Sequence, residues 1–189
     1  DNIKTLVDLG AKFLKLDLVT AINGDVTVGT KDGPLMIEVL DVIDEYIKKE
    51  GRSPVGFNFE INTAAGDEEG KSVPYYHAHA DFVMMDLWGR YMGDRLMITG
   101  SDYRSLNHLN EKYPEVDLAF KVAQGTEDAE KAMKRLKFTP KWTSFHYTDI
   151  NEDIVKKYHD KGMYVSAWGI DNQETAAQAS ALGVDALIY

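Results

Sequence analysis

Two oppositely charged residues, Lys15 and Asp17, share one face of a predicted strand at residues 12–19. Side chains alternate along a strand, so Leu14 and Leu16 point to the opposite face. A strand of a parallel sheet that is buried on both faces would be apolar throughout. Because a buried ion needs a partner, the pair indicates either an edge strand with this face in water or charges at the mouth of a barrel.

Polar side chains also share one face of a second predicted strand, where Asn58, Glu60 and Asn62 alternate with apolar residues. We expect Asp17 and Glu60 to lie on neighbouring strands and to face one cavity. Two carboxylates alone are a poor site for Mg²⁺ or Ca²⁺, which take about six or more oxygen ligands, so water and the two asparagines would have to complete it. The ammonium of Lys15 repels a cation, and our hypothesis is that it takes the cation's electrostatic place by pairing with Asp17 or Glu60.

Three residues, of which Lys15 is one, are candidates for chemistry or for the wall of a pocket. Lys15 can form a Schiff base when its pKa is lowered, although nearby carboxylates raise a lysine pKa. His146 ends a predicted strand, from which its imidazole can reach the mouth of a barrel as an acid or base. Trp168 also ends a strand, where it either lines the cavity or packs in the core.

A pair of histidines, His77 and His79, forms an H-x-H motif at the start of a predicted helix. Such a pair can bind zinc on a strand, but on a helix the two side chains diverge. We therefore expect both imidazoles to be solvated.

The elements that must position these residues alternate between strand and helix. Strands are predicted at residues 12–19, 25–28, 55–62, 95–99, 116–122, 142–147, 163–168 and 185–189, and helices at 1–9, 34–49, 75–91, 103–112, 126–136, 151–161 and 172–182. Connections of this length imply parallel pairing of seven main strands. Polar residues near the carboxyl ends of short strands favour a TIM-type (β/α) barrel. An open doubly wound sheet is the competitor, and no glycine-rich fingerprint supports a dinucleotide-binding version.

The composition predicts one soluble domain, residues 1–189, with a sizeable core. The net charge of −10 argues against nucleic acid or an anionic membrane surface as partner. The chain has no cysteine, so it has neither a disulfide nor a thiolate metal site. No apolar run of about 18 residues is present to span a bilayer, and no signal peptide is evident, which leaves cytoplasmic and exported locations open.

Several blocks of the chain, in order, resemble the glycerophosphodiester phosphodiesterase family. The segment 14–24 resembles its E-x-D-V-x-x-T-x-D-G motif, 57–62 its N-I-E-I-K strand, and 183–188 its G-V-D-G-I-I strand. Further blocks at 1–11, 34–40, 97–102 and 164–171 are similar to other parts of the family. The resemblance implies a (β/α) barrel and metal-assisted hydrolysis of a phosphodiester in lipid and glycerol metabolism. In the family two histidines act as acid and base, and carboxylates hold a divalent cation, Mg²⁺ or Ca²⁺.

The resemblance also assigns site residues, with departures. It implies Asp17 and Glu60 as metal ligands and Asn62 and Trp168 as pocket residues, whereas Lys15 replaces a metal-binding glutamate. The family's H-R-G motif is not present, and a glycine stands where its second histidine is expected. The catalytic residues stay unassigned, with Lys15 and the histidine at 146 as candidates.

Two functions follow from these residues. One is glycerophosphodiester phosphodiesterase activity by lineage, impaired in this chain. The alternative is a non-catalytic or engineered barrel that binds a small polar or phosphate-containing ligand. A barrel with a shortened loop after residue 28, whose first strand and last helix are missing, would expose the strand edges at 13–19 and 185–189 and favour homo-oligomers.

Overall fold

A computed structural model describes residues 2–22, 25–28, 34–61, 75–90, 93–126 and 128–189. Its strands are β1 (Phe13–Ile22), β2 (Asp25–Val28), β3 (Gly56–Ile61), β4 (Leu96–Gly100), β5 (Asp117–Lys121), β6 (Trp142–His146), β7 (Tyr164–Trp168) and β8 (Ala186–Ile188). Its α-helices are α1 (Asn2–Asp8), α2 (Met36–Lys49), α3 (Tyr76–Leu87), α4 (Tyr103–Lys112), α5 (Ala129–Met133), α6 (Glu152–His159) and α7 (Gln173–Ala181), with 3₁₀ turns η2 (Gly93–Arg95) and η3 (Tyr147–Asp149).

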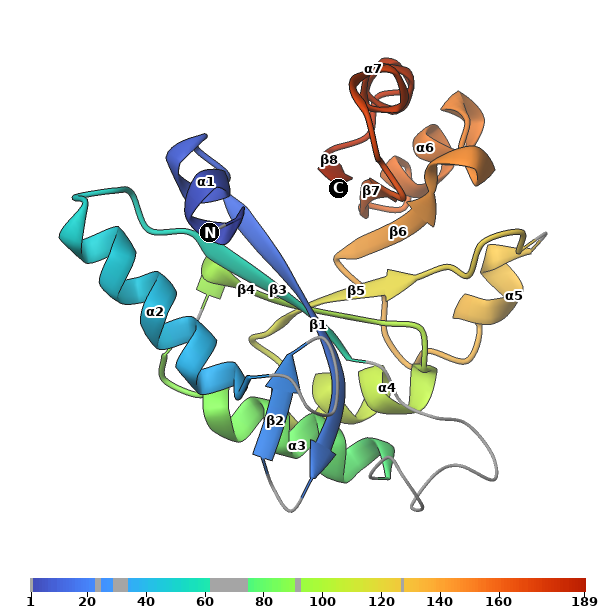
Figure 1. The fold of residues 1–189 in the computed structure, drawn as a ribbon. Helices are drawn as coiled ribbons and strands as arrows, with labels where there is room; N and C mark the ends of the chain where they lie inside the picture. Colours follow the sequence, from blue (N-terminus) through green and yellow to red (C-terminus); the bar gives the residue numbers. More distant parts are fainter. Residues whose placement is uncertain (1, 23–24, 29–33, 62–74, 91–92, 127) are drawn as a thin grey trace.

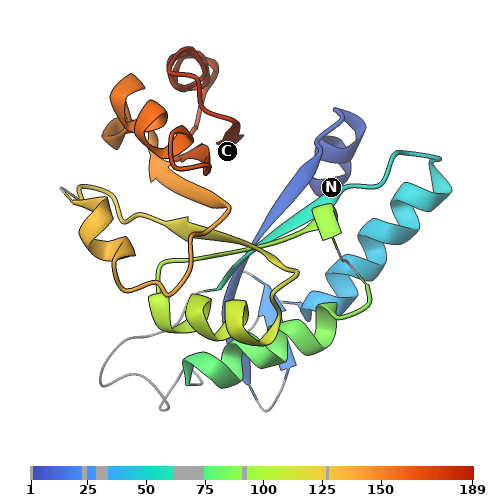
Figure 2. The same ribbon diagram turned by 180° about the vertical axis from the view of Figure 1, so that it is seen from behind.

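The described strands form one sheet in the order β2-β1-β3-β4-β5-β6-β7-β8. β1 and β3 to β8 are parallel to their neighbours, whereas β2 pairs antiparallel with the carboxyl-terminal half of β1. The seven parallel strands curve into a nearly closed barrel with helices outside it (Figures 1 and 2). The predicted TIM-type barrel is therefore confirmed.

Alternation along the strands separates the outer core from the lumen of the barrel. On β1, Leu14 and Leu16 are buried, as expected for residues that pack beneath the helices. The facing stripe of α2 is Met36, Leu40, Ile43 and Ile47, spaced four, three and four residues apart, which places them on one side of a helix.

Side-chain caps fix the loops at the carboxyl ends of three strands. Asp102 after β4, Asn151 after β6 and Asn172 after β7 each accept a backbone N–H of the helix that follows. Asn172 also forms a capping box with Thr175. Each cap contributes about 1 kcal/mol and determines where its helix begins.

Two predicted helices are shorter in the structure. The helix predicted at 126–136 is limited to α5, Ala129–Met133, which has no buried residue to hold a longer helix against the barrel. The helix predicted at 75–91 ends at Leu87, because Gly89 adopts φ +77° and ends it with a left-handed residue.

The barrel has a seam between β1 and β8. In the part of the chain that the structure describes, neither the outer edge of β8 nor the amino-terminal half of β1 on the side away from β3 pairs with a strand. A cavity of about 830 Å³ lies along the seam and reaches the lumen. Figure 1 shows α1 and β8 on opposite sides of this opening. None of the described helices is long and apolar enough to cross a bilayer.

Candidate functional site

The lumen of this barrel is polar. TIM barrels usually fill this space with layers of branched apolar side chains. Here the alternation of the strands directs charged, amide and hydroxyl side chains into it. Asn58, Glu60, Thr99, Ser144 and Ser166 are buried, and Lys15 and Lys121 are partly exposed. This polar lumen is the candidate ligand site, because ligand sites combine a concave wall with a few convergent polar groups.

The centre of the lumen is one carboxylate held between two ammonium groups. Lys15 Nζ lies 2.6 Å from Glu60 Oε2, and Lys121 Nζ donates a hydrogen bond of 2.6 Å to Glu60 Oε1. The Glu60 side chain is 7% exposed, against 21% for Lys15 and 24% for Lys121. The carboxylate therefore lies behind its two lysines, with the cationic side chains more accessible than the anionic one.

Lys121 is the site residue that the sequence reasoning missed. It lies on β5, 61 residues from Glu60, and reaches Glu60 past the one intervening strand, β4. A signal was present, since Lys121 is a lone cation near the carboxyl end of an otherwise apolar segment, Leu118–Phe120. That is the same pattern that identified Lys15.

Trp168 and His146 form the adjoining wall of the site. Lys121 Nζ lies 4.6 Å from the centroid of the Trp168 ring, within the range of a cation–π interaction. The His146 ring packs edge-on against Trp168 with centroids 4.6 Å apart. Gly169 makes this packing possible, because it has φ +81° and a Cβ there would lie 2.5 Å from His146 Nε2.

The remaining predicted site residues have different outcomes. The backbone of Asp17 pairs in register with Glu60, as expected for neighbouring strands, but its side chain is outside the described part of the structure. Asn62 lies outside the described residues. His146 Nδ1 lies 2.7 Å from Thr148 Oγ1. A catalytic role for this histidine in proton transfer stays a prediction, and so does a catalytic role for Lys15.

The described lumen does not fit a divalent cation. Both oxygens of Glu60 contact ammonium groups, and Asn58 Oδ1 accepts the hydroxyl of Thr99 at 2.7 Å. Among the described residues no cluster of three or more acidic, histidine or cysteine side chains could hold a metal ion. At about 4 Å and an effective dielectric constant near 20, one ammonium repels a divalent ion by about 8 kcal/mol.

Outside the lumen, the histidine prediction is only half right. His77 is exposed, but His79 is fully buried, with no hydrogen-bond partner for either ring nitrogen among the described residues. Burial lowers the pKa of His79 to about 4. The helix periodicity that separates the two side chains also sends the second one into the packing of α3 against the barrel and α4.

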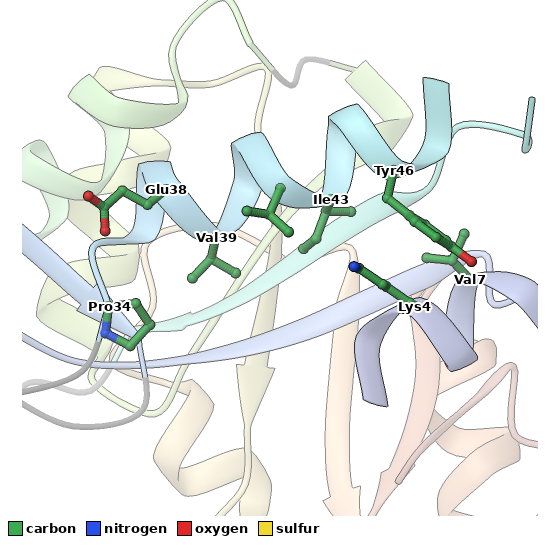
Figure 3. Close-up of a pocket in the computed structure, with 8 residues that line it drawn as sticks. Lys4, Val7, Pro34, Glu38, Val39, Ile43 and Tyr46 are labelled. Carbon is green, nitrogen blue, oxygen red and sulfur yellow. The ribbon is translucent and has the colours of Figure 1, made fainter. Parts of the chain in front are cut away.

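A second cavity, of about 360 Å³, lies between α1 and α2 on the outside of the barrel. Figure 3 shows Ile43 and Tyr46 of α2 beside Lys4 and Val7 of α1, with Val39 nearer to Pro34. Its lining is largely apolar and gathers no group of catalytic or metal-binding side chains. The candidate site is therefore the lumen.

A parallel barrel with convergent polar groups near the carboxyl ends of its strands defines a TIM-type ligand-binding or catalytic protein. A sequence model of the glycerophosphoryl diester phosphodiesterase family matches residues 11–189, so the chain belongs to this family. The predicted family is thereby confirmed.

Individual relatives agree with this assignment. The Bacillus subtilis protein YhdW, whose name assigns it provisionally to the glycerophosphodiester phosphodiesterases, is 24% identical over 93 residues. That alignment covers 49% of this chain and only 38% of YhdW. A phosphodiesterase from Oleispira antarctica, solved in complex with the product sn-glycerol-3-phosphate, has a TM-score of 0.76 at 14% identity, covering 98% of this chain and 84% of its own.

The family generally uses a divalent cation. One structural neighbour is described as a calcium-dependent phosphoinositol-specific phospholipase C from Pseudomonas, with a TM-score of 0.62, 12% identity, and coverage of 99% of this chain and 82% of its own. In the described lumen, by contrast, Glu60 contacts two lysines, and their positive charges oppose the binding of a cation.

Proposed function

We propose that this chain binds the phosphate group of small glycerophosphodiesters, or of the glycerol phosphate derived from them, in the lumen of its barrel. The observation that carries the proposal is the pair of ammonium groups, Lys15 and Lys121, that contact Glu60 at 2.6 Å each. An ammonium has three N–H donors. An ammonium that contacts a carboxylate oxygen can also donate to a phosphate oxygen.

The lineage supports this class of ligand. The chain belongs to a family named for phosphodiester hydrolysis, and the Oleispira neighbour is described with sn-glycerol-3-phosphate as its product. The seam cavity, lined by Lys15, Asn58 and Ser166 among others, offers polar contacts for a small ligand.

Hydrolysis by this chain is expected to be slow. An ammonium nitrogen lies 2.6 Å from each oxygen of Glu60, and these two positive charges oppose the approach of a metal ion to the carboxylate. His146 is the remaining candidate acid or base of the described lumen. We thus propose that the site derives from that of a phosphodiesterase, but that this chain catalyses the family reaction slowly.

Calorimetric titration with sn-glycerol 3-phosphate tests the binding, and glycerol is the control that lacks the phosphate. We expect heat of binding for the first and none for the second. Failure of both to bind would refute the proposed function. Release of glycerol 3-phosphate from glycerophosphocholine tests the rate, and rapid metal-dependent turnover would contradict the expected impairment.

A second copy of the chain is proposed to cover the seam. The strand edges beside it carry backbone groups that can pair with another chain, and Leu9 at the seam is 79% exposed. Burial of this side chain on association would favour a homo-oligomer.

A further inference from the structure

We infer that Lys15 and Lys121 replace the divalent cation of the family as the phosphate-binding charge, so that this barrel binds phosphate monoesters without metal. The inference rests on the proposed function, which it deepens by naming the ligand class and the source of the positive charge.

Both lysines act at one place on the wall of the lumen. Each ammonium contacts a different oxygen of the same carboxylate, Glu60. The two nitrogens are therefore held near each other, and one tetrahedral phosphate can accept from both. A metal ion achieves the same result by contacting two phosphate oxygens from a single centre.

The order of exposure favours an anion over a cation. The two lysine side chains are three times as exposed as Glu60, at 21% and 24% against 7%. An incoming phosphate meets ammonium groups first. A cation would have to displace an ammonium group from each carboxylate oxygen that it bound.

The lysines are held in position before any ligand arrives. Glu60 pairs with both, and the Trp168 ring supports Lys121 from 4.6 Å. Such a site binds without first ordering two flexible side chains, which is a large part of the cost of ligand binding by lysine.

Lys15 faces the seam cavity, whereas Glu60, Lys121 and Trp168 are not among the residues that line it. Lys15 lines this cavity of about 830 Å³ together with Asn58, Ser166 and Asp185. The amide and the hydroxyl can donate to phosphate or glycerol oxygens. The opening is large enough for glycerol 3-phosphate, because small-molecule sites begin at about 300 Å³.

Recognition by two fixed charges predicts a preference among phosphates. A monoester such as sn-glycerol 3-phosphate carries nearly two negative charges at neutral pH, whereas a phosphodiester carries one. We therefore expect sn-glycerol 3-phosphate to bind more tightly than glycerophosphocholine.

The test is calorimetric titration of the full chain with sn-glycerol 3-phosphate in excess EDTA and again with added Mg²⁺ or Ca²⁺. We expect the same affinity in both conditions. Binding only with added metal would overturn the inference and leave the proposed function intact. No binding in either condition would overturn the proposed function itself.

Charge-removing variants locate the site. Lys15→Met and Lys121→Met keep the apolar stem, and each is expected to weaken metal-free binding at least tenfold, because a charged hydrogen bond is lost. The matched control is Lys141→Met, which removes a surface lysine that also pairs with a carboxylate, Asp117, and is expected to leave the affinity unchanged. Unchanged affinity in both lumen variants would overturn the inference.

A double variant keeps the test valid if a single lysine change leaves Glu60 badly paired and unfolds the chain. Lys121→Met combined with Glu60→Gln removes both charges of that pair together. We expect this variant to melt near the wild-type temperature and to bind sn-glycerol 3-phosphate at least tenfold more weakly. Wild-type affinity in the folded double variant would overturn the inference.

Discussion

Acid should weaken this fold through one buried side chain, His79. The perturbation is His79→Leu, which replaces an imidazole by an apolar group of similar size on α3. His79 is 0% exposed and burial lowers its pKa from 6.5 to about 4. Neither ring nitrogen has a hydrogen-bond partner among the described residues.

The magnitude follows from linkage between protonation and folding. Between pH 6.5 and 4 the unfolded chain binds a proton at His79 that the folded chain does not, so the free energy of unfolding falls as the pH falls. The two pKa values differ by about 2.5, and at 1.36 kcal/mol per pKa unit the full loss approaches about 3 kcal/mol below pH 4. About 2 kcal/mol of it is expected between pH 7 and pH 5.

Urea unfolding at a series of pH values measures this loss. We expect His79→Leu to remove about 2 kcal/mol of the wild-type decline between pH 7 and 5, and to raise stability at pH 7 because two unpartnered nitrogens are removed. The matched control is His77→Leu on the exposed face of the same helix, which should keep the wild-type decline. An equal decline in wild type and His79→Leu would refute the reasoning.

Three further changes have measurable outcomes. Gly169→Ala should destabilise the fold by about 1–2 kcal/mol, because φ +81° disfavours a side chain, and should shift the fluorescence of Trp168 as His146 is pushed aside. Burial raises the pKa of Asp81, but hydrogen bonds from a lysine and a histidine of α4 outweigh burial and lower the pKa overall. Asp81→Asn should therefore lower the free energy of unfolding at pH 7 by about 1 kcal/mol, after allowance for solvent screening. That cost should vanish as the pH falls through the lowered pKa. Leu9→Lys at the seam should shift the chain towards monomer in sedimentation velocity. The expectation for Gly169→Ala would be contradicted by wild-type stability and fluorescence. A pH-independent loss of stability would contradict the one for Asp81→Asn, and unchanged association would contradict the one for Leu9→Lys.

The strand–helix alternation and the faces of the strands could be predicted from the sequence because both depend on short-range geometry. Side chains alternate along any strand, so Leu14 and Leu16 had to point opposite to Lys15 whatever surrounds them. The same alternation placed Asn58 and Glu60 on one face. The order of the motifs was enough to identify the family, since it is a property of the chain and not of its packing.

The partners of these side chains depended on the order of the strands in the sheet. Lys121 reaches Glu60 from β5, 61 residues away along the chain, and no periodicity specifies that contact. Likewise, helical spacing separated His77 from His79, but only the packing of α3 showed that His79 is the buried one.

The sequence by itself determined the barrel, the family and the placement of Lys15 and Glu60 in one lumen, because these follow from local periodicity and the order of motifs. Only the tertiary structure decided that a second lysine completes the site and that Glu60 is engaged on both oxygens. The physical reason is that the sheet places β3 and β5 on either side of β4, where side chains of the lumen face can reach each other although they are far apart in the sequence. Which charges pair there depends on the order and register of the strands.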